Sequence, residues 1–194
     1  MPGHTIEQTP TESKAEGTLI CISNNINYKL RNDLKVYKSK ELESTFVELI
    51  FEKRKNIIIG CIYRHPTMST SDFNDNYLEI LLNNISNFNK PVFLAGDFNF
   101  NLLKQNDHPD TDKFLSILHS HYLLPLITSP TRISSHSATL IDNIFTNTNE
   151  IQIFSGNIST SISDHLPQFA FVSDFFQQNA NNEKNLWKRD FRNF

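Results

Sequence analysis

The segment Asn56–Tyr63 is apolar almost throughout and rich in β-branched side chains. A continuous apolar run of this kind predicts a buried central strand, because a strand with one wet face would alternate between apolar and polar residues. The run stops at Arg64-His65-Pro66, where proline cannot donate a ladder hydrogen bond. The sequence therefore predicts a sheet built around this strand.

The remaining segments predict further strands and two helices. Strands are expected at residues 17–23, 45–51, 92–95, 139–146, 151–154 and 168–172. One helix, which Ser71 or Asp72 can cap and Pro91 ends, is predicted by an apolar stripe made of Phe73, Tyr77, Leu81, Ile85 and Phe88. A second helix is expected at residues 111–121. Many strands with only two helices predict a mixed, layered α/β fold.

The composition fits one ordinary domain, since the chain has 194 residues of which 38% are hydrophobic. A formal net charge of −3 gives no whole-chain reason to expect nucleic-acid binding. Basic residues gather in three places, and each cluster fits either a solvated surface or a phosphate-binding one: residues 29–40, 53–55 and 184–192. Cys21 and Cys61 lie in strand-like runs and are predicted to be buried free thiols.

Three aspartates stand at the edges of apolar runs, where a carboxylate needs a reason. They are Asp97 in Gly96-Asp97-Phe98-Asn99, Asp142 after Leu140-Ile141, and Asp164 before His165. Three carboxylates with an asparagine and a histidine suit metal-assisted hydrolysis of a phosphate ester. Each of the three aspartates, taken alone, equally fits a turn or a polar surface.

The local patterns around these residues suggest how they would work. If the backbone stays extended, Asp97 and Asn99 point to the same side, and Gly96 allows a turn or a close approach. Asp142 lies within an apolar strand, where a carboxylate is costly unless it is paired, and a histidine is its natural partner.

The order of these motifs resembles the endonuclease/exonuclease/phosphatase superfamily. The closer resemblance is to the apurinic-endonuclease-like domain of non-LTR (LINE-type) retrotransposons, and it covers roughly residues 17 to 172. It is carried by the site motifs with three further segments, Ile62-Tyr63-Arg64-His65-Pro66, Ser129-Pro130-Thr131-Arg132-Ile133 and Thr139-Leu140-Ile141-Asp142-Asn143-Ile144-Phe145. The resemblance implies a DNase I-like fold, a two-layer β-sandwich of mixed sheets flanked by helices.

The resemblance also implies a role for each site residue. His165 would contact the scissile phosphate, and Asp142 would orient it. Asp97 would position or deprotonate the attacking water, while Asn99 would hold that water or a phosphate oxygen. Tyr63 would reach the phosphate with its hydroxyl. Its metal, Mg²⁺ or Mn²⁺, would be bound with the help of Asp164, directly or through water. The implied partner is DNA, and the implied activity is that of a nicking endonuclease.

The sequence departs from this family at its start. The family begins with a strand carrying an asparagine and a second strand ending in a glutamate, the main metal ligand. Glu7, Glu12 and Glu16 lie in a polar context that predicts a loop, so none replaces that glutamate. We therefore expect a polar segment at 1–16, a partial domain at 17–173 that lacks its first strands, and a linker at 174–194 toward an absent reverse transcriptase.

Such a chain is expected to be weak or inactive as a nuclease. Two other functions stay open, namely a phosphatase of the same superfamily and a non-catalytic remnant that binds nucleic acid. No secretory signal or apolar run of membrane length is visible, so an intracellular location is expected, nuclear if the protein is functional.

Overall fold

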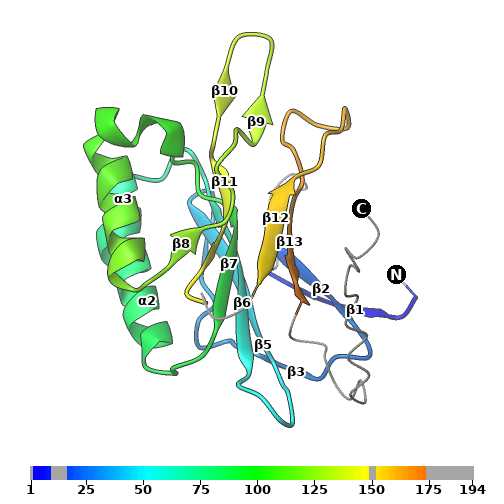
Figure 1. Ribbon diagram of the computed structural model, residues 1–194. Coiled ribbons are helices and arrows are strands. Elements are labelled where there is room, and N and C mark those ends of the chain that lie inside the picture. The colour runs from blue at the N-terminus through cyan, green and yellow to red at the C-terminus, as the bar shows by residue number, and fades with distance from the viewer. Residues whose placement is uncertain (1, 10–16, 149–151, 174–194) are drawn as a thin grey trace, which may run out of the picture.

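A mixed β-sheet forms the centre of the computed structural model, which describes residues 2–9, 17–148 and 152–173 (Figure 1). Its strands are β3 (Tyr28–Leu30), β4 (Tyr37–Lys38), β5 (Leu42–Leu49), β6 (Ile57–Arg64), β7 (Val92–Asp97), β8 (Leu124–Pro125) and β11 (Asp142–Thr146). Their order is β3-β5-β6-β7-β11-β8, with β4 also paired to β5. Only β6 and β7 run parallel among the described pairs of this sheet.

Helices cover one face of this sheet (Figure 1). They are α1 (Thr70–Phe73), a π-helical turn at Asn74–Leu78, α2 (Glu79–Ser86), a 3₁₀ segment at Leu102–Asp107, and α3 (Pro109–Ser120). The predicted apolar stripe is confirmed, because four of its five members are buried and Phe88 packs against them. Ser69 caps α1 in place of the predicted Ser71 or Asp72, and its hydroxyl accepts a hydrogen bond from the Asp72 amide at 3.3 Å. A phenylalanine cluster fills the space between helices and sheet: Phe46, Phe73, Phe98, Phe114 and Phe145.

The opposite face carries two separate antiparallel pairs. One is β1 (His4–Gln8) with β2 (Leu19–Ser23), and the other is β12 (Ile153–Asn157) with β13 (Gln168–Val172). A short pair, β9 (Arg132–Ile133) with β10 (Ala138–Thr139), projects beyond one end of the sheet (Figure 1). The predicted mixed sheet with flanking helices is confirmed, while the second layer consists, among the described residues, of two hairpins rather than one sheet.

An apolar groove lies beside β13, on the sheet face opposite the helices. It has a volume of about 270 Å³. Its walls include Leu49, Ile59, Phe93, Ile144 and Val172. Within the described chain, β13 pairs only with β12, so its other edge carries no strand. The groove is therefore an apolar floor with an open strand edge beside it.

The loop predicted for residues 1–16 is wrong at its start, because His4–Gln8 forms β1. Pairing with β2 supplies backbone hydrogen bonds that stabilise this strand, although the β-propensity of the polar segment alone does not predict it. Glu7 lies on this strand and accepts a hydrogen bond from the Tyr28 hydroxyl at 2.6 Å. Glu12, Glu16 and the predicted linker at 174–194 lie outside the described residues.

The prediction of two buried thiols is also wrong for Cys21, which is exposed, although both cysteines are free. Cys21 pairs with Ile6 across the β1–β2 hairpin, and both point to the outer side of the hairpin layer. Cys61 is half-buried on β6, where burial raises the pKa of its thiol to about 11. No helix in the described ranges is long and apolar enough to cross a membrane.

Candidate active site

Three site residues stand in one row across three neighbouring strands. Tyr63 on β6 is the register partner of Asp97 on β7, and Asp97 is the register partner of Asp142 on β11. Register partners on adjacent strands point to the same face of a sheet. By the same alternation this is the face of Phe93 and Ile144, so the row and the apolar groove share one face.

Gly96 determines how closely β6 and β7 approach just before Asp97. Its φ is +153°, and a Cβ placed on it would lie 1.8 Å from the Ile62 carbonyl oxygen. A side chain at this position would collide with the backbone of β6. Glycine is therefore required for β7 to lie this close to β6. This close pairing places Asp97 in the row.

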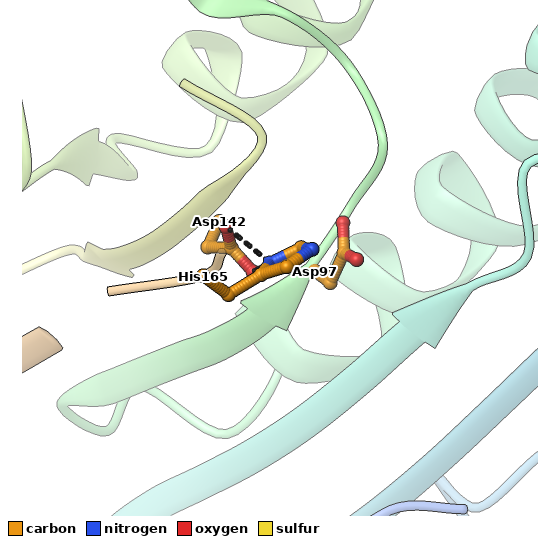
Figure 2. Close-up of side chains that lie close together, drawn as sticks. All are labelled: Asp97, Asp142 and His165. Atoms are coloured by element: carbon orange, nitrogen blue, oxygen red, sulfur yellow. Dashed lines mark hydrogen bonds and ion pairs between the residues drawn. The ribbon is translucent and has the colours of Figure 1, made fainter. Parts of the chain in front are cut away.

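His165 reaches the row from the loop before β13. Its Nδ1 lies 3.0 Å from Oδ1 and 3.1 Å from Oδ2 of Asp142, as predicted for a carboxylate that orients an imidazole (Figure 2). Asp142 is nearly buried, with a side-chain exposure of 11%, whereas that of His165 is 32%. With Nδ1 facing the carboxylate, Nε2 is the ring nitrogen left for a substrate.

A fully buried threonine ties the His165 loop to β11. The Thr131 hydroxyl accepts hydrogen bonds from the amides of Ile141 and Asp142 at 3.2 and 3.1 Å. Its carbonyl accepts a hydrogen bond from the Leu166 amide at 2.7 Å. Sequence reasoning did not assign Thr131 a role, although it lies in one of the motifs that carry the resemblance. The sequence signal for this role was the position of a hydroxyl residue directly before β9, the first strand of the β9–β10 pair.

Asp97, Asp142 and His165 each offer one ligand atom, and these atoms lie within 4.8 Å of one another (Figure 2). Burial and the charge of Asp142 raise the pKa of the Asp97 carboxyl to about 6, against contributions from the Asn99 amide, His165 and Arg132 that lower it. Two neighbouring carboxylates that repel one another are an arrangement that a divalent cation stabilises. The three residues therefore fit a metal ion.

Asn99 is held by Arg64 in the turn after β7. Its φ of +53° breaks the extended backbone that would have put both side chains on one side. Its backbone amide donates to Asp97 Oδ1 at 3.0 Å, and its Nδ2 donates to the Arg64 carbonyl at 2.7 Å. The buried Arg64 guanidinium in turn donates to the carbonyls of Phe98, Asn99 and Met68. The turn after β7 is thus fixed by an arginine whose role the sequence did not reveal.

Tyr63 and Asp164 lie at the margin of the group. The Tyr63 ring is half-buried and packs edge-on against His65, with 6.0 Å between ring centroids. Asp164 is exposed and accepts a hydrogen bond from Arg132 Nε at 2.7 Å. That guanidinium lowers the pKa of the Asp164 carboxyl. The structure therefore brings Asp97, Asp142 and His165 together, places Tyr63 next to them in the row, and pairs Asp164 with Arg132.

Comparisons with known proteins identify the family and the fold of the chain. A family model described as Endonuclease-reverse transcriptase (Exo_endo_phos_2) matches residues 57–169. The endonuclease domain of TRAS1, a telomere-specific non-LTR retrotransposon, is 14% identical with a TM-score of 0.65, over 89% of this chain and 81% of that one. A comparison with curated protein sequences gave no match.

Two other solved structures have the same fold. The mannosyl-6-phosphatase Bt3783 of Bacteroides thetaiotaomicron is 14% identical with a TM-score of 0.60, over 89% of this chain and 78% of that one. The human Nocturnin catalytic domain is 16% identical with a TM-score of 0.59, over 86% and 70%. Identities this low establish the fold alone. The superfamily expected from the sequence is confirmed by the family model together with this fold.

Proposed function

Because the chain belongs to the endonuclease-reverse transcriptase family of the endonuclease/exonuclease/phosphatase superfamily, we propose that it hydrolyses phosphodiester bonds in DNA as the nicking endonuclease of a retrotransposon. The observation that supports this most directly is the meeting of Asp97, Asp142 and His165 at one end of the sheet. All three lie within the segment that the family model matches.

In the proposed reaction, a water oxygen attacks the phosphorus and the bond to the 3′ oxygen breaks, which leaves a 3′-hydroxyl. Asp97 takes the proton of the attacking water, and its pKa of about 6 suits a base that works near neutral pH. His165 Nε2 contacts a phosphate oxygen, while Asp142 fixes the ring. A bound Mg²⁺ or Mn²⁺ would supply neutralisation of charge on the phosphate.

Tyr63 and Asn99 keep supporting roles in this proposal. Tyr63 stands beside Asp97 in the row, at the distance of one strand, from which its hydroxyl can reach the phosphate. Asn99 has its Nδ2 engaged with the Arg64 carbonyl, so its Oδ1 is the atom suited to holding the water. Asp164 as a helper in metal binding stays a prediction.

We further propose that this centre is completed by an extended segment lying in the apolar groove. The groove shares the sheet face of the site and borders the open edge of β13, so a strand added there would run toward Asp97 and Asp142. A carboxylate at its end would complete the metal shell. On this proposal the 194-residue chain alone nicks DNA weakly.

Plasmid nicking with Mg²⁺ tests both proposals. The 194-residue chain is compared with a chain extended upstream by the genomic reading frame, and each is paired with its Asp97→Ala and His165→Ala variants. If the extended chain nicks the plasmid and each substitution abolishes this nicking, the proposed function is supported. Equally strong nicking by the short chain would contradict the proposal that a segment in the groove completes the site. No nicking by either chain would refute the nuclease.

A phosphatase is the second candidate, favoured by the similar fold of the Bacteroides thetaiotaomicron mannosyl-6-phosphatase. Both activities need the same carboxylates and histidine, so the substrate decides between them. Release of inorganic phosphate from a panel of sugar and lipid monoesters, without plasmid nicking, would replace the nuclease by this candidate. Salt-dependent DNA binding without either reaction would instead indicate a binding remnant.

A further inference from the structure

Arg132 is positioned at the site by its backbone. It forms a bridge pair with His165, so the residue that would touch phosphate and Arg132 lie on adjacent chain segments. The neighbouring Ile133 amide donates to the Asp164 carbonyl at 2.9 Å, which fastens the same two segments a second time. The β9 strand therefore carries Arg132 beside the imidazole without any need for a long loop.

The Arg132 guanidinium is hydrogen-bonded through its Nε but, among the described residues, not through its terminal amino groups. Its Nε donates to Asp164 Oδ2 at 2.7 Å, and the exposed fractions of the two side chains are 50% and 47%. Within the described residues, its two terminal amino groups make no hydrogen bond. A guanidinium anchored through Nε keeps its outer edge in a fixed plane, with the fork geometry that matches phosphate oxygens.

The negative charge of the site requires a cationic group if DNA phosphates are to bind there. DNA brings negative phosphates to a place that already holds the carboxylates of Asp97 and Asp142, both close enough to act on the charge of Arg132. Arg64 is also near Asp97, but it is buried and its donors serve backbone carbonyls. Arg132 is thus the exposed arginine directed at the reacting end of the sheet in the described chain.

We propose that Arg132 binds a phosphate oxygen of the DNA backbone beside Asp97, Asp142 and His165, and that Asp164 is a positioning residue that aims its guanidinium. This inference rests on the proposed function and names a binding residue for the same site. It gives Asp164 a role besides the predicted help in metal binding, because Oδ2 of its carboxylate accepts from Arg132 Nε.

The test measures binding of a duplex oligonucleotide by fluorescence anisotropy in EDTA, over a range of KCl concentrations. Arg132→Ala should weaken binding and reduce the magnitude of the slope of log K against log salt by about 1, the loss of one phosphate contact. Arg132→Lys should keep most of the slope but bind less tightly, because an ammonium has no fork. Lys113→Ala, on α3 over the opposite face of the sheet, is the matched control, because its ion pair with Asp75 is similarly exposed, and it should leave the slope unchanged.

Asp164→Asn decides the positioning role by the sign of its effect. If Asp164 acted only through its charge, its removal would strengthen DNA binding. If it aims Arg132, its removal weakens binding, and the double variant with Arg132→Ala binds like Arg132→Ala alone. Tighter binding by Asp164→Asn, or an effect that adds to that of Arg132→Ala, would overturn this role.

The outcomes separate this inference from the proposed function. A wild-type chain that binds DNA together with an Arg132→Ala variant of unchanged affinity and slope would refute the inference alone. A wild-type chain without salt-dependent DNA binding would remove the proposed function and the inference with it. Thermal unfolding of each variant checks folding, and little change is expected because an exposed ion pair contributes little to stability.

Discussion

Arg64 and Asn99 hold each other's backbone: the Arg64 Nη2 donates to the Asn99 carbonyl at 2.8 Å, and the Asn99 Nδ2 donates to the Arg64 carbonyl at 2.7 Å. Arg64 also lies over the Phe100 ring, with 4.6 Å from Cζ to the ring centroid. This reciprocal pair fixes the end of β6 to the turn after β7. Asp97 is the last residue of β7, so its position depends on both Arg64 and Asn99.

Arg64→Lys should therefore disturb the site as well as the fold. Lysine keeps the charge but cannot serve the four carbonyls to which the guanidinium donates, and each unsatisfied buried carbonyl costs about 1–3 kcal/mol. We expect a loss of roughly 2 kcal/mol in unfolding free energy by urea titration and reduced nicking. Arg31→Lys is the matched control, because Arg31 is equally buried and bonded to Asp33 and Glu48. A comparable loss of activity in this control at equal stability would refute a role specific to Arg64.

Asp97→Asn should stabilise the protein at neutral pH. The folded state raises the pKa of this carboxyl from 3.8 to about 6, so the proton is bound more tightly in the folded chain. Its contribution to stability is complete below pH 3.8 and is lost as the pH rises through about 6, a difference of at most ~3 kcal/mol. The asparagine variant should gain about 1–3 kcal/mol in urea unfolding at pH 7.5 while losing nicking. An equal gain at pH 3.5 would contradict this cause.

Gly96→Ala should prevent β6 and β7 from pairing at the site. The added methyl would stand 1.8 Å from the Ile62 carbonyl oxygen, which belongs to the backbone and cannot move aside like a side chain. We expect a loss of about 3 kcal/mol or more, or no soluble folded protein. Gly3→Ala is the control, since its φ of +77° is positive like that of Gly96 but nothing lies within 4 Å of the methyl position there. Equal melting temperatures of the two variants would contradict the close approach.

His165→Ala and Asp142→Asn should affect nicking by the extended chain to different degrees. Removing the imidazole removes a contact to the phosphate and should lower kcat about 10²–10³-fold. Asp142→Asn leaves the imidazole present but replaces its carboxylate partner, which is 3.0 Å from Nδ1. Its kcat should fall as well, and the double variant should be no worse than His165→Ala, because Asp142 acts through the ring. Additive losses would mean that Asp142 acts mainly on another group.

The apolar groove gives a test that needs no activity. The groove, with Phe93, Ile144 and Val172 in its walls and open among the described residues, should bind the dye ANS in the 194-residue chain. An upstream extension that fills it should abolish the fluorescence. Val172→Lys should reduce dye binding in the short chain. Unchanged dye fluorescence in the extended chain would contradict the proposed strand.

Periodicity and spacing predicted the elements that carry the site. The predicted run Asn56–Tyr63 corresponds to the central β6 (Ile57–Arg64), and the stripe from Phe73 to Ile85 faces the core, because both patterns extend over enough residues to be distinct. Asp142 and His165 were predicted to pair, and they do. The mixed α/β fold followed from many strands spaced around two helices, and the solved structures share it. The superfamily followed from the order of motifs, which the family model confirms.

Contacts between distant segments were beyond the sequence. The register that aligns Tyr63 with Asp97 is set by strand pairing, which no local pattern specifies. Arg64 looked like a charged strand end, although it shares its face with Ile58 and Ile62, and that parity was the available signal of burial. Strand β1 was missed because its stability comes from β2.

The parallel pairing of β6 with β7 has a consequence for how the molecule folds. The β5–β6 hairpin joins segments close in the chain, whereas β6 and β7 are separated by residues 65–91, which hold the helices of the crossover. Pairings distant in sequence lose more chain entropy and form more slowly. We therefore expect Asp97 to pair with Tyr63 late during refolding, so that the site recovers after most of the β-structure has formed. A folding intermediate that precedes this step would contain the β5–β6 hairpin but lack the assembled site.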